Sequence, residues 1–123
     1  FTVSMADAKN VIAADYVGIV SGNDVSDKVV KAGWHITKSE FVDAPIFEEL
    51  PMTLECKMIS YDEETELMTG DIVNICVDES ILGEDGKIDL TKFQPITYDP
   101  VHHDYLTLGA KVGNAFKDGK QLK

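Results

Sequence analysis

The sequence predicts an α+β protein, in which an antiparallel sheet or barrel is accompanied by two short helices near the start of the chain. Residues 52–58 alternate between apolar and polar side chains, which is the pattern of a half-buried strand. A second strand-like run follows at residues 67–78, and signals for the start and end of a helix occur twice before residue 34. A chain of 123 residues is long enough for one domain, which we expect to span residues 1–123.

The chain opens with a pattern typical of a strand. Phe1, Val3 and Met5 share one face of residues 1–5, and Ser4 or Asp7 can cap a first helix that runs to Tyr16. A natural chain rarely begins in mid-strand, so we expect that N-terminal strands of the fold are missing from this sequence.

A second helix is predicted between Asp24, a good N-cap, and Ala32, with Gly33 as its C-terminal stop. The next segment, residues 35–51, contains two prolines, which preclude a long helix. We therefore expect this segment to cross the surface in an extended or loop-like conformation.

A hairpin is predicted for residues 52–78. One face of its first strand carries Met52, Leu54, Cys56 and Met58, and the other carries Thr53, Glu55 and Lys57. We expect the apolar face to be the buried one. In the second strand, Gly70 indicates a bulge or a close approach of another group.

The remaining segment predicts little regular structure. Residues 83–87, GEDGK, form a turn, residues 89–93 can form one helical turn, and residues 96–99 suit a short strand. The tail from Tyr105 onward is rich in glycine and lysine, and we expect it to loop over the body.

The net charge is −11, and all eleven cationic side chains are lysines. An acidic surface repels phosphate backbones, so nucleic-acid binding is excluded as a main function. A phosphate ligand would depend on backbone N–H groups, hydroxyls and lysine, because arginine is absent.

The two cysteines, Cys56 and Cys76, stand in strand-like runs without a CxxC spacing. We interpret both as buried free thiols, which suits a reducing cytoplasm. No apolar stretch reaches the length of a membrane span.

No protein-based catalytic centre is evident. His102 and His103 are adjacent, so a strand would point them to opposite faces, and His35 after Trp34 suits packing or capping. Neither an HExxH nor a Walker-type motif occurs. Paired acids such as Glu48–Glu49 and Glu63–Glu64 indicate solvated turns, so hydrolysis is poorly supported.

Residues 16–28, YVGIVSGNDVSDK, leave two interpretations open. The small residues and a following helix start could hold an anion. Asp24 and Asp27 occupy that same end and would repel one, so the residues alone favour a purely structural turn. Lys28 is positioned to offset the repulsion.

Several short motifs, in order, resemble the flavin reductase-like family, the FMN-binding split barrels that include flavoredoxins. They are SGNDVSDK, the run Asp43-Ala44-Pro45, the segment from Glu49 to Cys56, Gly70 to Val73, and Gly86 to Asp89. Each is weak alone, but together they extend to about Leu108. The resemblance implies a split β-barrel of antiparallel strands with short helices.

The resemblance also implies a cofactor site. The loop of Met5, Ala6 and Asp7 would lie near an FMN. The turn of Ser21, Gly22 and Asn23, and above all Lys28, would approach the cofactor. Thr65 stands where many relatives have a histidine, and Tyr98 or Tyr105 could stack on the flavin ring. No metal is implied.

The implied function is hydride or electron transfer between NADH or NADPH, bound FMN and an acceptor, which could be a redox protein. The cofactor carries that chemistry, so no catalytic triad is needed. The resemblance also implies a homodimer. Two alternatives stay open: a flavin-binding module without turnover, and a dimerisation module with the same fold.

Overall fold

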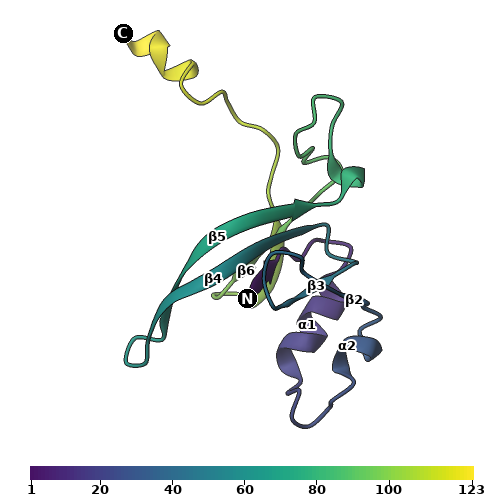
Figure 1. Ribbon diagram of the computed structural model, residues 1–123. Coiled ribbons are helices and arrows are strands. Elements are labelled where there is room, and N and C mark those ends of the chain that lie inside the picture. Colours follow the sequence, from purple (N-terminus) through teal and green to yellow (C-terminus); the bar gives the residue numbers. More distant parts are fainter.

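The structure, a computed structural model, describes residues 1–123 as three small antiparallel sheets with two α-helices (Figure 1). The largest sheet has the order β1 (Thr2–Ser4), β4 (Met52–Asp62) and β5 (Leu67–Val77). The other sheets pair β2 (Ile36–Lys38) with β3 (Pro45–Phe47), and β6 (Ile96–Asp99) with β7 (Asp104–Thr107). The helices are α1 (Val11–Ile19) and α2 (Lys28–Lys31), with short 3₁₀ helices η1 (Glu79–Ile81) and η2 (Asp118–Leu122). The predicted α+β class is confirmed.

The β4–β5 hairpin is the backbone of the fold. Its register runs from Met52 opposite Val77 to Asp62 opposite Leu67, with two irregularities along β4. β1 pairs only with the beginning of β4. The far half of the hairpin is therefore two-stranded, and Figure 1 shows it projecting from the body.

Gly70 is a point of close approach, as the sequence indicated. A Cβ atom at this position would lie 2.8 Å from the Phe1 ring and 3.1 Å from the Lys57 carbonyl oxygen. The ring of Phe1 therefore packs directly on the backbone of β5, where no side chain larger than glycine's fits.

The first half of β4 buries residues of both faces, whereas we expected the apolar face alone to be buried. Cys56 of the apolar face is 4% exposed, but Thr53 and Glu55 of the polar face are each only 1% exposed, and Met58 is largely exposed. The reason is that polar groups cover the polar face and satisfy it. Ser39 Oγ donates to Glu55 Oε1, and Asn74 Nδ2 donates to Glu55 Oε2.

Both helices begin later than predicted. The Asp7 carboxylate accepts the backbone N–H of Asn10, so residues 7–10 form a turn and Asn10, not Ser4 or Asp7, is the N-cap of α1. In the same way, Asp24 belongs to a turn that its backbone N–H closes on Ser21, and α2 starts after Asp27.

Gly33 ends α2 as predicted. Its φ is +77°, and the N–H groups of Gly33 and Trp34 donate to the carbonyls of Val30 and Val29. This is the Schellman pattern, which glycine adopts without steric cost.

Residues 35–51 are extended or loop-like, as expected, and two stretches of them pair as the β2–β3 hairpin, with Pro45 at the first position of β3. Two further expectations were wrong. Cys76 is exposed, since it lies on the outer strand of the sheet, although both thiols are free as expected. Beyond Thr107 the tail does not fold over the body but runs away from it (Figure 1).

The core is small for a chain of this length. Only nine of the 123 residues are buried: Asp7, Trp34, Ser39, Leu50, Thr53, Glu55, Cys56, Ile81 and Phe93. Large apolar side chains consequently remain exposed on α1, on the far half of β4–β5 and along the tail. Such surfaces usually mark interaction sites. No helix is both long enough and apolar enough to cross a bilayer.

We expect Glu55→Ala to lower the free energy of unfolding by about 1–3 kcal/mol, because Ser39 and Asn74 would lose their buried acceptor. Urea denaturation followed by circular dichroism measures this change. Glu63→Ala, in the exposed hairpin turn, is the control and should change stability by less than about 0.5 kcal/mol. Equal effects of the two substitutions would contradict the role given to Glu55.

Candidate functional site

The loop after β1 is clamped between two parts of the chain. The Met5 N–H donates to the Met52 carbonyl at 2.8 Å, and the Ala6 carbonyl accepts from the Ile96 N–H at 3.1 Å. Asp7 forms an isolated antiparallel bridge with Pro95. The predicted cofactor loop of Met5, Ala6 and Asp7 thus lies at the junction of β1, α1 and β6.

Asp7 is the most enclosed of the predicted site residues, with 5% of its surface exposed. Its Oδ1 accepts from the backbone N–H of Asn10 at 3.0 Å and from Asn10 Nδ2 at 2.9 Å. The same amide group also donates to the Glu49 carbonyl. Asp7 therefore fixes the entry of α1.

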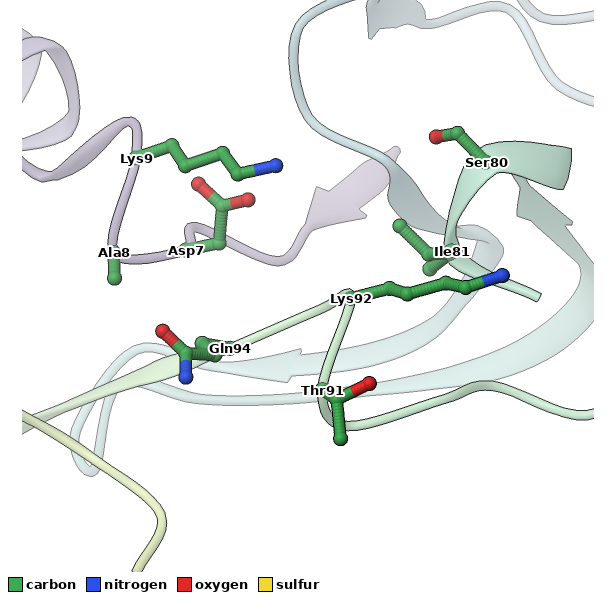
Figure 2. Close-up of a pocket in the computed structure, with 8 residues that line it drawn as sticks. All are labelled: Asp7, Ala8, Lys9, Ser80, Ile81, Thr91, Lys92 and Gln94. Atoms are coloured by element: carbon green, nitrogen blue, oxygen red, sulfur yellow. The ribbon is translucent and has the colours of Figure 1, made fainter. Parts of the chain in front are cut away.

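A cavity of about 420 Å³ opens beside this loop (Figure 2). It is lined by Asp7, Ala8, Lys9, Ser80, Ile81, Thr91, Lys92 and Gln94. In Figure 2 the Lys9 side chain runs beside the Asp7 carboxylate, whereas the Lys92 side chain points away from Asp7, past Ile81. Lys92 Nζ donates to the Leu82 carbonyl at 2.6 Å, whereas Lys9 takes part in no ion pair. Hydroxyl, amide and ammonium groups suit a polar ligand that carries negative charge.

Lys28 is engaged with the end of α1. Its Nζ donates to the carbonyls of Val17 and Val20, each at 2.8 Å. These carbonyls would otherwise lack a helical partner, and a cation at a helix C-terminus is favourable. Two of the three ammonium protons of Lys28 therefore hold the turn of residues 20–28 against the helix.

The turn itself is closed by its own hydrogen bonds. Ser21 Oγ accepts from the Asn23 N–H at 3.2 Å, and the Ser21 carbonyl accepts from Val25 at 3.0 Å. Asp27 pairs with Lys31 at 3.0 Å, so its charge is partly offset. Ser21, Gly22 and Asn23 are exposed and lie one turn beyond α1.

Tyr98 and Tyr105 are brought together as directly opposed residues of β6 and β7, with ring centroids 5.8 Å apart. Tyr105 Oη donates to Asp15 Oδ1 of α1 at 2.7 Å. That hydrogen bond, with smaller contributions from burial and the charge of Asp15, raises the pKa of Tyr105 above its ordinary value. Tyr98 Oη lies 2.6 Å from His103 Nδ1. Both rings remain about half exposed and form an aromatic surface next to α1.

Thr65 is not near the other predicted residues within the chain. It lies in the turn between β4 and β5, where its N–H donates to Asp62 Oδ1 at 2.9 Å. Figure 1 places this turn at the end of the hairpin that is remote from α1.

All the predicted residues except Thr65 belong to segments that border α1. The loop of residues 5–7, the turn of residues 21–28 and the tyrosine pair all contact α1 or its ends through the bonds described above. No group of three or more histidine, cysteine or acidic side chains is placed to hold a metal ion.

Sequence reasoning missed two features of this region. It did not anticipate that Lys9 and Lys92, 83 positions apart, line one cavity with Asp7, which the pairing of Ala8 with Gln94 brings about. It also took Glu49 as part of a solvated turn. The Glu49 carboxylate instead accepts from the backbone N–H of His35 at 2.8 Å and lies 2.6 Å from His35 Nδ1.

Solved structures similar to this chain share its fold along nearly its whole length. The flavoredoxin of Desulfovibrio vulgaris (Miyazaki F) matches with a TM-score of 0.88 and 38% sequence identity, over 97% of this chain. The flavoredoxin of Methanosarcina acetivorans matches with a TM-score of 0.86 and 28% identity, over 99%. An FMN-binding domain of a flavin reductases-like enzyme from Shewanella baltica has a TM-score of 0.79 at 15% identity, over 93% of this chain, and shows likeness of fold alone.

This chain covers 64% of each of the two flavoredoxins and 62% of the Shewanella domain. No family model and no curated protein sequence matches it. The split barrel that the sequence motifs implied is thereby confirmed at the level of the fold.

The pKa of His35 should lie above 6.5, because its hydrogen bond and charge interaction with Glu49 favour the protonated ring. Burial raises the pKa of Glu49, but the bonds from His35 outweigh it and the net shift is downward. The stabilisation by the pair is therefore fully present below pH 6.5 and is lost as pH rises through the raised pKa of His35. At the acidic end it is lost as Glu49 becomes protonated.

Nuclear magnetic resonance titration of the His35 ring measures this pKa. Glu49→Gln should return it toward the ordinary value, whereas Glu48→Gln, the control, should change it much less. A His35 pKa that is unaffected by Glu49→Gln would refute the pairing.

Proposed function

Because the chain has the split-barrel fold of the flavoredoxins and flavin reductase-like proteins, we propose that it is a flavin-binding redox protein that uses FMN. The observation that carries the proposal is the similarity to the Desulfovibrio flavoredoxin, at 38% identity over 97% of this chain. When bound, FMN would supply hydride and electron transfer between NADH or NADPH and an acceptor. We further propose a cytoplasmic protein that works as a homodimer.

The proposed site is the surface along α1 that joins the loop of residues 5–7, the turn of residues 21–28 and the tyrosine pair. Its residues fit an FMN in three respects. The tyrosine rings are exposed enough to stack on a flat ring. Lys28 keeps one ammonium proton free beyond its two bonds to α1. The enclosed Asp7 can accept a hydrogen bond from a ribityl hydroxyl through Oδ2.

Within this site the protein's own groups would position the cofactor and exclude water from it. Asp15 holds the Tyr105 hydroxyl, so that ring cannot turn freely. The positive charge of Lys28, or of Lys9 beside the loop, would stabilise negative charge on a phosphate or on a reduced ring. No acid or base of the protein needs to act in the redox chemistry.

The exposed apolar side chains favour one alternative, a dimerisation module with the same fold. A flavin-binding module without turnover is the other. The three functions differ in what the purified chain does with FMN and nicotinamide nucleotides.

We expect the purified chain to bind FMN with quenching of flavin fluorescence, and the bound flavin to bleach in the blue on addition of NADH or NADPH. Anaerobic absorbance titration measures both steps. Binding without bleaching would identify the module without turnover. Failure to bind FMN would overturn the proposed function and leave the dimerisation module.

Lys28→Ala should weaken FMN binding by about 1–3 kcal/mol, the contribution of a charge-assisted hydrogen bond. Isothermal titration calorimetry measures it. The same substitution should destabilise the free protein, because the carbonyls of Val17 and Val20 lose their donor. Lys111→Ala, in the exposed tail, is the control. Lower stability with unchanged FMN affinity would leave Lys28 a purely structural role.

A further inference from the structure

The last fifteen residues form an arm that makes no recorded hydrogen bond to the rest of the protein. Residues 109–123 are exposed throughout, and Figure 1 shows them leaving the body after β7. Their only hydrogen bonds are internal, such as the Asn114 N–H to Asp118 Oδ2 at 2.7 Å. The arm nevertheless has a defined conformation, with a turn at residues 114–118 and the 3₁₀ helix η2.

The arm exposes apolar side chains that a solvated tail would not need. Val112, Phe116 and Leu122 are essentially fully exposed, Phe116 at 96%. Phe116 also has a φ of +63°, which is unusual for a bulky residue. Its backbone therefore holds a conformation that is costly unless another contact compensates for it.

Figure 1 shows the arm running away from the body of its own chain. Its exposed apolar side chains therefore have no partner within the chain and are available to a second molecule.

The arm and the far half of the β4–β5 hairpin carry opposite net charges, and both expose apolar side chains. The arm contains four lysines and one aspartate, a net charge of +3, while the remaining residues carry 21 acids and seven lysines, a net charge of −14. Residues 58–72 of the hairpin contain five acids and no lysine. Met58, Tyr61, Met68 and Ile72 share one face of the hairpin by its register, and we call these exposed apolar side chains the hairpin patch.

We propose that the arm of one copy of this chain docks on the hairpin patch of a second copy. The apolar side chains of the arm would cover the patch, and its lysines would face Asp62, Glu63, Glu64 and Glu66 around the hairpin turn. A second copy is favoured over the same chain because Figure 1 shows the arm running away from its own hairpin turn. Residues 109–113, which precede the turn, reach about 17 Å when extended, and η2 adds about 10 Å, so the arm is long enough to contact a neighbouring subunit.

This inference rests on the homodimer proposed above and adds how the two copies hold each other. If both arms act, the contact is reciprocal, as a two-fold symmetric dimer requires. Opposite charges would also make the association weaken as salt is raised.

Sedimentation velocity of the full chain over a range of concentrations tests the docking. The wild type should dimerise, and Phe116→Asp or Met68→Asp should each raise the dimer dissociation constant at least about tenfold, as loss of an apolar anchor does. Val101→Asp, in the exposed β6–β7 turn outside both surfaces, should leave it unchanged. A wild-type monomer, or a Phe116→Asp variant that dimerises like the wild type, would overturn the proposal.

Charge reversal tests the polar part of the contact independently of the apolar part. Lys117→Glu with Lys120→Glu should weaken the dimer, and adding Glu63→Lys with Glu64→Lys should restore it. Circular dichroism confirms that each variant remains folded. A quadruple variant no tighter than the double variant would show that these charges do not meet.

A cysteine trap separates docking between copies from docking within one chain. In a Cys76→Ser background, Phe116→Cys with Met68→Cys should give a covalent dimer on a non-reducing gel. A cross-linked monomer would overturn the role of a second copy. FMN titration of the wild type distinguishes the two proposals. A monomer that binds FMN contradicts the homodimer and its arm but not the flavin function, and a dimer that ignores FMN contradicts only the flavin function.

Discussion

The hydrogen bonds accepted by the Glu55 carboxylate determine how the neighbouring elements pack against β4. It lies on β4 at 1% exposure and joins two elements, β5 through Asn74 and the loop after β2 through Ser39. Ser39 Oγ in turn accepts from the N–H groups of Phe41 and Val42 at 3.0 Å. With so few apolar side chains buried, this chain relies on a satisfied polar network to define its packing. A network of this kind specifies one arrangement only while every member has its partner.

The same network explains how α1 and the candidate flavin surface are placed. The β2–β3 hairpin is fixed over β4 by Ser39, and the residues that follow β3 lead to Glu49, whose carbonyl receives Asn10 at the start of α1. The loop of residues 5–7 is then enclosed from both sides. The position of the site thus depends on contacts made from β3 and β4 and not on α1 itself, which has no buried residue.

The sequence was informative where a local pattern decides the structure. Alternation of apolar and polar residues predicts the β4–β5 pairing. Glycine's tolerance of a positive φ predicts the end of α2 at Gly33, and its lack of a side chain predicts the tight packing at Gly70. Sequence reasoning failed where side chains distant in the sequence determine the structure. Glu55 looked like a solvent-facing residue because its partners stand 16 and 19 positions away. Lys28 looked like a free cation because nothing in the sequence indicates that its ammonium group returns to Val17 and Val20. Asp7 was predicted, whereas Lys9 and Lys92 come to the same cavity only through the tertiary fold.

Gly70 bears on how such sequences should be interpreted. It belongs to one of the short motifs that suggested a flavin protein, yet its requirement is steric: the Phe1 ring and the Lys57 carbonyl leave no room for a Cβ atom. A protein of this architecture that had given up its cofactor would still need glycine there in order to seat its first strand. The motif therefore indicates the split-barrel fold and gives no information about flavin binding. Flavin binding has to be tested at the surface along α1.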